Sequence, residues 1–211
     1  MLTIEQARAF YTSEDAVHDF EHVLRVYYTA LKLGKEEGAD LEILQVAALL
    51  HDARGAEPGG TGREKHHITS AIFAEEVLKK EDWPVERIRA VQHAIRAHRY
   101  RGKGDQPETI EAKVLFDSDK LDVIGAIGAA RTIAYSVLAG EPMYERPSEQ
   151  FRSSGVEETG ERHSSYHEYL FKLRKVKDRL FTDSARRMAE QRHVAMGAFF
   201  EQLAAEYEGD A

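Results

Sequence analysis

The chain has 211 residues, of which 42% are hydrophobic and 31% are charged, and this ordinary mixture excludes disordered and fibrous proteins. The net charge of −8 opposes long polyanions, which excludes a nonspecific nucleic-acid binder and leaves only a local basic patch for phosphate. The absence of cysteine excludes disulfides, thiolate nucleophiles and Cys-ligated metal centres. Any metal ion would therefore use His and carboxylate ligands. No apolar run approaches about 20 residues and no signal-peptide pattern opens the chain, so we expect a cytoplasmic protein without a membrane segment.

Apolar residues recur at helical spacing along most of the chain, and no segment alternates as a half-buried strand would. We therefore expect an all-α fold. The first long helix is predicted from about His18 to Gly34, and the next from Leu41 to Asp52 with Asp40 as its N-cap. Because this second helix is apolar on nearly every side, it should run through the centre of the fold.

The rest of the chain shows further helical segments separated by polar and glycine-containing loops. Helices are predicted at 66–80, 84–98, within 108–140, at 164–181 and at 183–207, with loops at 53–65, 99–107 and 141–162. Pro84 suits the first helical position, and Thr182 or Asp183 would cap the last helix. With no internal repeat and no linker, we expect a single domain over 1–211, with its core at about 15–140 and C-terminal helices at about 164–207.

The dipeptide His51–Asp52 ends the apolar helix, where an ionised carboxylate is costly to bury without a partner. The same argument applies to three acids in the apolar segment VLFDSDKLDVIGAIG, which are Asp117, Asp119 and Asp122. A divalent cation would supply the partner. Two imidazoles and two carboxylates make a mixed nitrogen and oxygen site, which suits Mn, Fe, Co, Ni or Zn better than Ca.

The order of these residues resembles the H…HD…D signature of the HD superfamily of metal-dependent phosphohydrolases. His22 comes first, the His51–Asp52 pair follows on the next helix, and an Asp of the DSDKLD segment comes last. The surrounding segments HDFEHVLRVYYTAL, ALLHDA, KHHITSA, FDSDKLDVIGAIGAAR and ARRMAEQRHVAMGAFFEQL are similar to those of small single-domain bacterial members. The resemblance covers about residues 15–205 and implies an HD-domain helical bundle.

The resemblance also implies a set of metal ligands, which are His22, His51, Asp52 and Asp119. The bound ion would be Mn, Fe, Co, Ni, Mg or Zn. Asp117 is the less favoured ligand, Asp122 would lie just outside the ligands, and Lys120 stands where related nucleotide hydrolases contact phosphate. Many relatives carry Glu where this chain has Gly55, so the general base stays open, with Glu57 and Glu64 in the adjacent loop.

Further residues are expected around this site. His67 and His98 are the favoured catalytic histidines; His93 and His98 lie about 140° apart around their helix, so only one should face the site. Arg54 and Arg99 are the residues expected to bind phosphate, and for Arg99, Arg101 and Lys103 a solvated charged loop explains the sequence equally well. The remaining histidines are expected to be structural or on the surface, and they are His18, His163, His167 and His193.

A divalent ion with an open position lowers the pKa of bound water and polarises a phosphoryl oxygen. We therefore expect a phosphohydrolase that acts on a nucleotide or another small phosphate ester, with no membrane or long nucleic acid as partner. Two alternatives stay open: a di-iron oxygenase of the same superfamily, with a second ion held by His67 and His93 or His98, and a non-catalytic metal-stabilised nucleotide sensor. The choice of substrate, of phosphate or pyrophosphate as product, and of monomer or homodimer also stays open.

Overall fold

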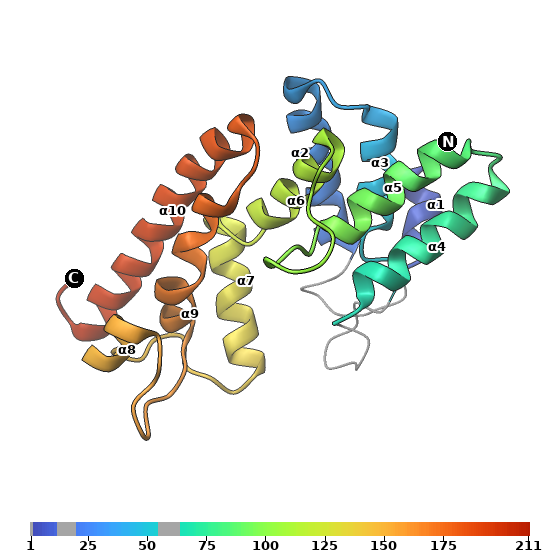
Figure 1. Ribbon diagram of the computed structural model, residues 1–211. Helices are drawn as coiled ribbons and strands as arrows, with labels where there is room; N and C mark the ends of the chain where they lie inside the picture. The colour runs from blue at the N-terminus through green and yellow to red at the C-terminus, as the bar shows by residue number, and fades with distance from the viewer. Residues whose placement is uncertain (1, 12–19, 55–63) are drawn as a thin grey trace. The chain divides into compact units, whose positions relative to one another are not determined.

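The structure is a computed structural model that describes residues 2–11, 20–54 and 64–211 (Figure 1). Within these ranges it contains helices and no strand, which confirms the expected all-α fold. The helices form two compact units. Unit 1 comprises Met1–Asp119 with Leu180–Ala185, and unit 2 comprises Lys120–Arg179 with Arg186–Ala211. The single domain expected over 1–211 stays a prediction.

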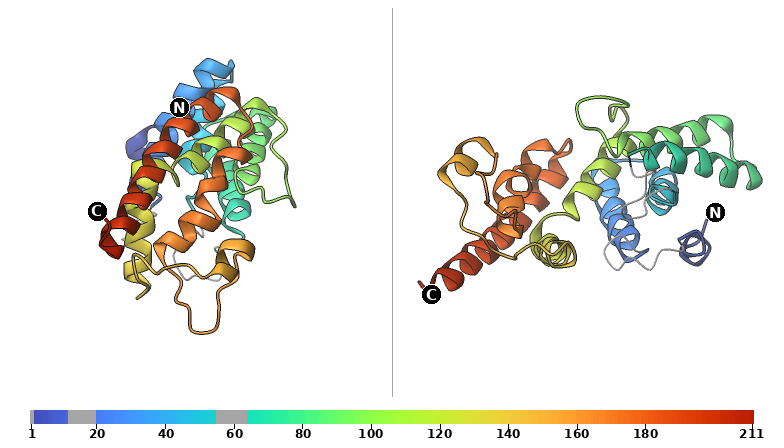
Figure 2. Two further views of the ribbon diagram at one scale, coloured as in Figure 1. Left: turned by 90° about the vertical axis from the view of Figure 1, so that its left-hand side faces the viewer. Right: turned by 90° about the horizontal axis from the view of Figure 1, so that it is seen from below.

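The described residues of unit 1 form five helices and most of a sixth. They are α1 (Ile4–Arg8), α2 (Phe20–Glu37), α3 (Leu41–Leu50), α4 (His66–Lys80), α5 (Val85–Ala97) and α6 (Ile110–Leu121). Helix α3 packs against α2 and α5, and α4 runs alongside α5 (Figures 1 and 2). Every α3 residue from Ile43 to Leu50 except Gln45 is buried, so this helix lies in the core as its composition predicts.

The start of α3 is fixed by the predicted cap. The Asp40 carboxylate accepts hydrogen bonds from the backbone N–H groups of Glu42 and Ile43 at 3.0 and 3.2 Å, an arrangement worth about 1 kcal/mol. Burial alone would raise the pKa of Asp40, but the Arg87 guanidinium, 2.9 Å from Oδ2, outweighs it and the pKa is lowered. At Gly34 a Cβ atom would lie 2.2 Å from a Leu44 methyl group, so glycine permits the close approach of α2 to α3.

Unit 2 contains the remaining elements. They are α7 (Gly125–Leu138), α8 (Glu149–Ser154), α9 (Ser165–Phe171), the 3₁₀ helix η1 (Leu173–Arg179) and most of α10 (Asp183–Glu208). Helix α7 packs against α9, and α9 against η1. Burial alone would raise the pKa of Glu161, but hydrogen bonds from His167, Ser148 and Glu158 outweigh it and lower the pKa to about 2. These contacts give His167 the structural role expected for it.

Several element boundaries differ from the prediction. The helical stretch expected within 108–140 breaks between α6 and α7, because Ile124 is extended and Gly125 has φ 79°. Pro84 is the N-cap of α5, with ψ 139°, rather than its first helical residue. The short helices α1 and α8 were not predicted, although Thr3 and Ser148 cap them with their hydroxyl groups.

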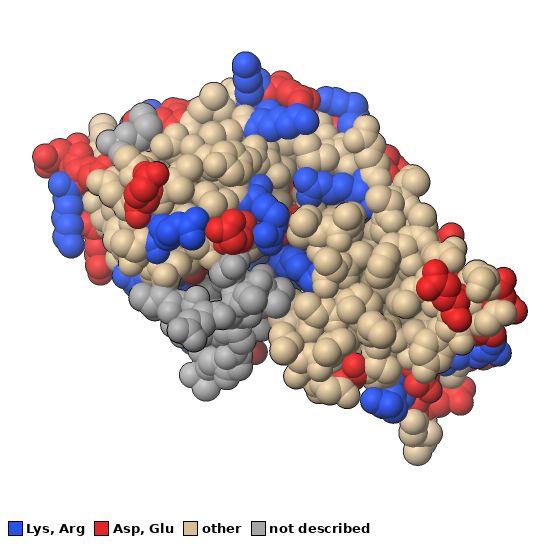
Figure 3. Space-filling view, turned by 180° about the vertical axis from the view of Figure 1, so that it is seen from behind, with Lys and Arg blue, Asp and Glu red and all other residues tan. Residues whose placement is uncertain are grey.

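The distribution of charged side chains on the surface and the lengths of the apolar helices both agree with the amino-acid composition. On the face shown in Figure 3, basic and acidic side chains are interspersed. Among the described residues no single helix is both long and apolar enough to cross a membrane, and one bent pair, α6 with α7, meets these criteria only when the two are taken together.

The buried Asp117 of α6 binds the segment that precedes α10. Its carboxylate accepts hydrogen bonds from the backbone N–H groups of Phe181 and Thr182 at 2.9 and 2.8 Å and from the Thr182 hydroxyl at 2.7 Å. The Thr182 oxygen in turn accepts from the Ala185 N–H at 3.4 Å, so Thr182 is the cap of α10 that the sequence left open. The acidic residue at 117 in an apolar stretch is therefore explained by these three donors.

We expect Asp117→Asn to lower the free energy of unfolding by about 1.5–3 kcal/mol, because an amide carries no charge and turns an NH₂ group toward one of the three donors. Urea unfolding followed by circular dichroism measures the change. The exposed Asp178→Asn is the matched control and should change the value by less than about 0.5 kcal/mol. Equal stability of the two variants would contradict this role of Asp117.

Candidate metal centre

The two carboxylate oxygens of Asp52 face different sets of histidines. Oδ2 lies 3.6 Å from His51 Nε2 and 3.9 Å from His22 Nε2. Oδ1 lies 3.1 Å from His66 Nε2 and 3.5 Å from His98 Nε2. The Asp that follows the apolar helix α3 is therefore the centre of the cluster, because both groups of imidazoles meet at its carboxylate.

The first group gathers side chains from three helices of unit 1. His22 lies in the first turn of α2, His51 is the C-cap of α3, and Asp119 lies in the last turn of α6. Their ligand atoms lie within 4.8 Å of one another, and His22 Nε2 is 3.4 Å from Asp119 Oδ1. With Asp52 Oδ2 beside them, the structure brings together all four residues expected to bind metal.

The state of His51 tests whether a metal ion fits this group. Its Nδ1 lies 2.8 Å from the Ala48 carbonyl oxygen, which can only accept, so the proton is on Nδ1 and Nε2 presents a lone pair. Nε2 is buried and has no hydrogen-bond partner among the described residues, which costs about 1–3 kcal/mol if nothing binds there. Burial lowers the pKa of His51 to about 4, although Asp52 acts in the opposite direction. A neutral imidazole with a free lone pair is the form that binds a divalent cation.

The carboxylates complete the fit. Burial alone would raise the pKa of Asp52, but His51, His66 and His98 outweigh it, so the pKa lies well below its usual value and the group is ionised. The Asp52 and Asp119 side chains are 15% and 16% exposed, whereas His51 is 0% exposed. Solvent therefore reaches the carboxylate side of the group, as an exchangeable water ligand requires.

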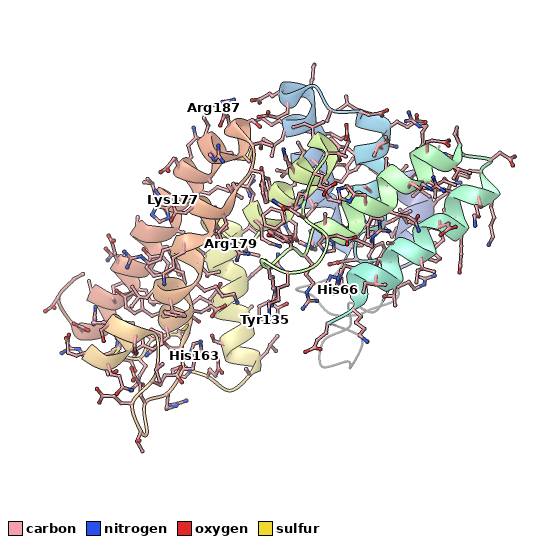
Figure 4. All side chains as sticks on the ribbon, viewed as in Figure 1. His66, Tyr135, His163, Lys177, Arg179 and Arg187 are labelled. Carbon is pink, nitrogen blue, oxygen red and sulfur yellow. The ribbon has the colours of Figure 1, made fainter. Side chains whose placement is uncertain are left out.

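The second group consists of Asp52, His66 and His98, whose ligand atoms also lie within 4.8 Å of one another. His66 is the first residue of α4 (Figure 4), and His98 is the C-cap of α5. His66 Nε2 and His98 Nε2 are 3.2 Å apart. Arg99 Nη1 lies 2.6 Å from His66 Nδ1, so the loop after α5 contacts the cluster directly.

Other predicted residues lie differently. His67 is half-buried, and its Nδ1 makes no hydrogen bond with any described residue; its neighbour His66 is the histidine beside Asp52. The Arg54 guanidinium lies 2.7 Å from the Ala53 carbonyl oxygen and 3.5 Å from the centre of the Phe73 ring. Burial lowers the pKa of His67 to about 4, with smaller contributions from His98, His66 and Arg99. The functions predicted for His67 and Arg54 stay predictions.

The other predicted residues are His93 on α5, Lys120 on α6, and Gly55, Glu57 and Glu64 before α4. His93 accepts a hydrogen bond from the Glu108 N–H at 3.3 Å, a contact that fixes the loop after α5. Lys120 follows Asp119 on α6 and is half-buried. Gly55 and Glu57 lie outside the described residues, and Glu64 is exposed.

Tyr11 is a residue that the sequence reasoning missed. Its hydroxyl donates to the Leu49 carbonyl oxygen at 2.8 Å, at the end of α3 where carbonyl groups lack helical partners. Burial raises the pKa of Tyr11 well above its usual value, and the Asp52 charge adds to this effect. The contact helps to hold the chain at His51 and Asp52. A lone tyrosine far away in the sequence carries no pattern that could have revealed it.

Comparison with known proteins places this geometry in a family. The sequence model of the HD domain matches residues 19–124, a range that contains both groups of the cluster. An uncharacterized protein of Bacillus subtilis (strain 168), YpgQ, is 33% identical over 195 residues, which cover 91% of this chain and 85% of YpgQ.

Solved structures agree along nearly the whole chain. The crystal structure of Bacillus subtilis YpgQ in complex with ADP has a TM-score of 0.73 and 29% identity, covering 99% of this chain and 100% of that one. An HD-superfamily hydrolase from Bacillus thuringiensis has a TM-score of 0.71 and 29% identity, covering 97% and 96% of the two chains. The resemblance found in the sequence is thereby confirmed, and the chain belongs to the HD-domain family, in the superfamily of metal-dependent phosphohydrolases.

Proposed function

We propose that the protein hydrolyses a phosphate ester or anhydride of a nucleotide, with one divalent ion held by His22, His51, Asp52 and Asp119. The observation that carries the proposal is the buried Nε2 lone pair of His51, which has no described hydrogen-bond partner and faces two carboxylates and a second imidazole. Support for a nucleotide comes from the relative YpgQ, whose crystal structure contains ADP.

The protein side chains prepare the site for this chemistry. When bound, such an ion supplies a water of lowered pKa and polarises a phosphoryl oxygen. The Ala48 carbonyl group orients His51 through Nδ1, and Asp52 keeps its negative charge because three imidazoles surround it. Arg99 contributes a permanent positive charge at the edge of the cluster, which would offset the charge of an incoming phosphate. Lys120, next to Asp119 in the sequence, is proposed as a second phosphate contact.

A direct experiment incubates the purified protein with nucleoside mono-, di- and triphosphates and one of Mn²⁺, Co²⁺, Ni²⁺, Zn²⁺ or Mg²⁺, and separates phosphate from pyrophosphate. We expect phosphorus-containing products in air and under nitrogen alike. Turnover that requires oxygen and bound iron would replace the proposal by an oxygenase. A nucleotide that stays bound and unchanged would replace it by a sensor.

We expect Asp52→Ala to lower metal affinity by more than about 100-fold, because removing a ligand should exceed the 10–100-fold loss typical of residues that only orient ligands. Activity should be lost with the metal, whereas α3, which ends at Leu50 and is packed independently, should keep its helix content. Elemental analysis, circular dichroism and turnover on one preparation check this. Full metal occupancy in Asp52→Ala would show that the HD pair does not bind the ion.

The pair Asp119→Asn and Asp117→Asn tests which acid of the DSDKLD segment is the ligand. Asp119 lies 3.4 Å from His22, whereas Asp117 is occupied by Phe181 and Thr182. We therefore expect metal affinity to fall in Asp119→Asn and to change little in Asp117→Asn. A calorimetric metal titration measures the affinity of both variants. A larger loss of affinity in Asp117→Asn than in Asp119→Asn would show that Asp119 is not the ligand.

Lys120→Ala should lower turnover about 10²- to 10³-fold, the range for removing one preorganised donor, and leave the bound metal unchanged. The matched control is Lys113→Ala, two turns earlier on α6. Steady-state kinetics and elemental analysis on the same samples separate the use of the ion from its binding. A Lys120→Ala protein with a lowered melting temperature and normal turnover would remove Lys120 from the site.

A further inference from the structure

Arg99 fixes the position of the proton on His66. Its Nη1 lies 2.6 Å from His66 Nδ1. A guanidinium group only donates hydrogen bonds and stays protonated in proteins, so His66 Nδ1 must accept. A neutral imidazole carries one N–H, and in His66 that proton is therefore on Nε2, the nitrogen that faces Asp52 and His98.

His98 has the opposite polarity. Its Nδ1 lies 2.5 Å from the Ile95 carbonyl oxygen, which can only accept, so the His98 proton is on Nδ1 and Nε2 presents a lone pair. His66 Nε2–H then donates to His98 Nε2 at 3.2 Å, and the negative Asp52 Oδ1, 3.1 Å from the same nitrogen, stabilises that proton. His66 and His98 therefore satisfy each other through one hydrogen bond, whereas the buried Asp52 Oδ1 accepts none from the described residues.

Whether the group beside Nδ1 accepts or donates a hydrogen bond determines whether Nε2 of the same histidine can bind a metal ion or carries a proton. A histidine that binds metal through Nε2 gives its Nδ1–H to a carbonyl, a carboxylate or water. His51 has such a partner in Ala48, and His98 has one in Ile95. At His66 the group beside Nδ1 is instead Arg99 Nη1, which offers another N–H where an acceptor is required.

We propose that Arg99, His66 and His98 form a hydrogen-bond network beside Asp52 and that His66 and His98 are not a second metal site, with Arg99 as the positioning residue that keeps the proton on His66 Nε2. In the phosphohydrolase proposed above, on which this assignment of substrate rests, the His66 N–H leaves His98 Nε2 when substrate binds and donates to a phosphoryl oxygen beside a single ion. Arg99 then acts through His66 rather than as a freely moving phosphate-binding arginine.

The proton position can be read by NMR in the metal-free full-length protein. Long-range ¹H–¹⁵N correlations distinguish the two forms of a neutral imidazole, and His66→Gln assigns the signals. We expect the proton on Nε2 in the wild type and in Arg99→Lys, because lysine also only donates. In Arg99→Glu it should move to Nδ1, because a carboxylate accepts. A wild-type His66 with its proton on Nδ1 would overturn the proposal.

A metal count gives a second, independent readout. Titration with Zn²⁺ and with Mn²⁺, followed by ultrafiltration and elemental analysis, should give one ion per chain in the wild type, Arg99→Lys and His66→Gln. Arg99→Glu should take up a second ion, because His66 Nε2 then presents a lone pair toward Asp52 and His98. Arg101→Glu, with the same charge change in the same loop, should keep one ion. Two ions in the wild type, one of them lost in His66→Gln, would overturn the proposal.

These outcomes separate this inference from the proposed function. One ion per chain and a proton on His66 Nε2, together with no turnover of any nucleotide, would contradict the hydrolase and support the network. Nucleotide turnover that requires two ions would support the hydrolase and contradict the network. If Arg99→Glu fails to fold, the wild-type NMR signals and the His66→Gln metal count decide the matter.

Discussion

The cluster depends on one buried negative charge, the carboxylate of Asp52 at the end of the apolar helix α3. A carboxylate in such a place is costly unless it is compensated, and the groups around it are imidazoles on α2, α4 and the ends of α3 and α5. His66 turns an N–H toward it, whereas His51 and His98 present lone pairs, so the ion that we propose would supply the remaining compensation. Four elements must therefore converge on a single residue. The packing of α2 and α5 against α3, with the close approach at Gly34, brings them to the same point.

Three of the four histidines around Asp52 are distinguished by the group that contacts the Nδ1 atom of each ring. A carbonyl group behind His51 and His98 turns their Nε2 lone pairs inward, whereas a guanidinium group behind His66 turns a proton inward. Groups outside the cluster thus decide what each ring offers to its interior. Arg99 and Tyr11 therefore shape the chemistry of the centre through the groups that they contact, His66 and the Leu49 carbonyl.

The sequence predicted the helices and the four gathered residues because both have local signals. Apolar spacing marks the helices, and an acid inside an apolar stretch marks a need for compensation. It did not single out His66 or Tyr11, for a physical reason. Adjacent histidines at the start of a helix point about 100° apart, so a shift of one residue in the helix start decides which one faces inward. The Tyr11 contact spans 38 residues and has no periodicity. The break between α6 and α7 depends on a glycine with positive φ, which the apolar pattern does not show.

Asp117 and Asp119 stand two residues apart on α6, so their side chains leave the helix about 200° apart, toward nearly opposite sides. One carboxylate ties down the backbone at Phe181 and Thr182, and the other joins His22 and His51. The last turns of α6 therefore hold the backbone at Phe181 and Thr182 on one side and the histidine cluster on the other, and the spacing of the two aspartates sets this arrangement. Inserting or deleting one residue between the two aspartates would rotate one carboxylate by about 100° around the helix axis relative to the other. A loop elsewhere can change in length during evolution without this effect. Changing the interval between Asp117 and Asp119 by one residue would break either the hydrogen bonds to Phe181 and Thr182 or the contact with His22.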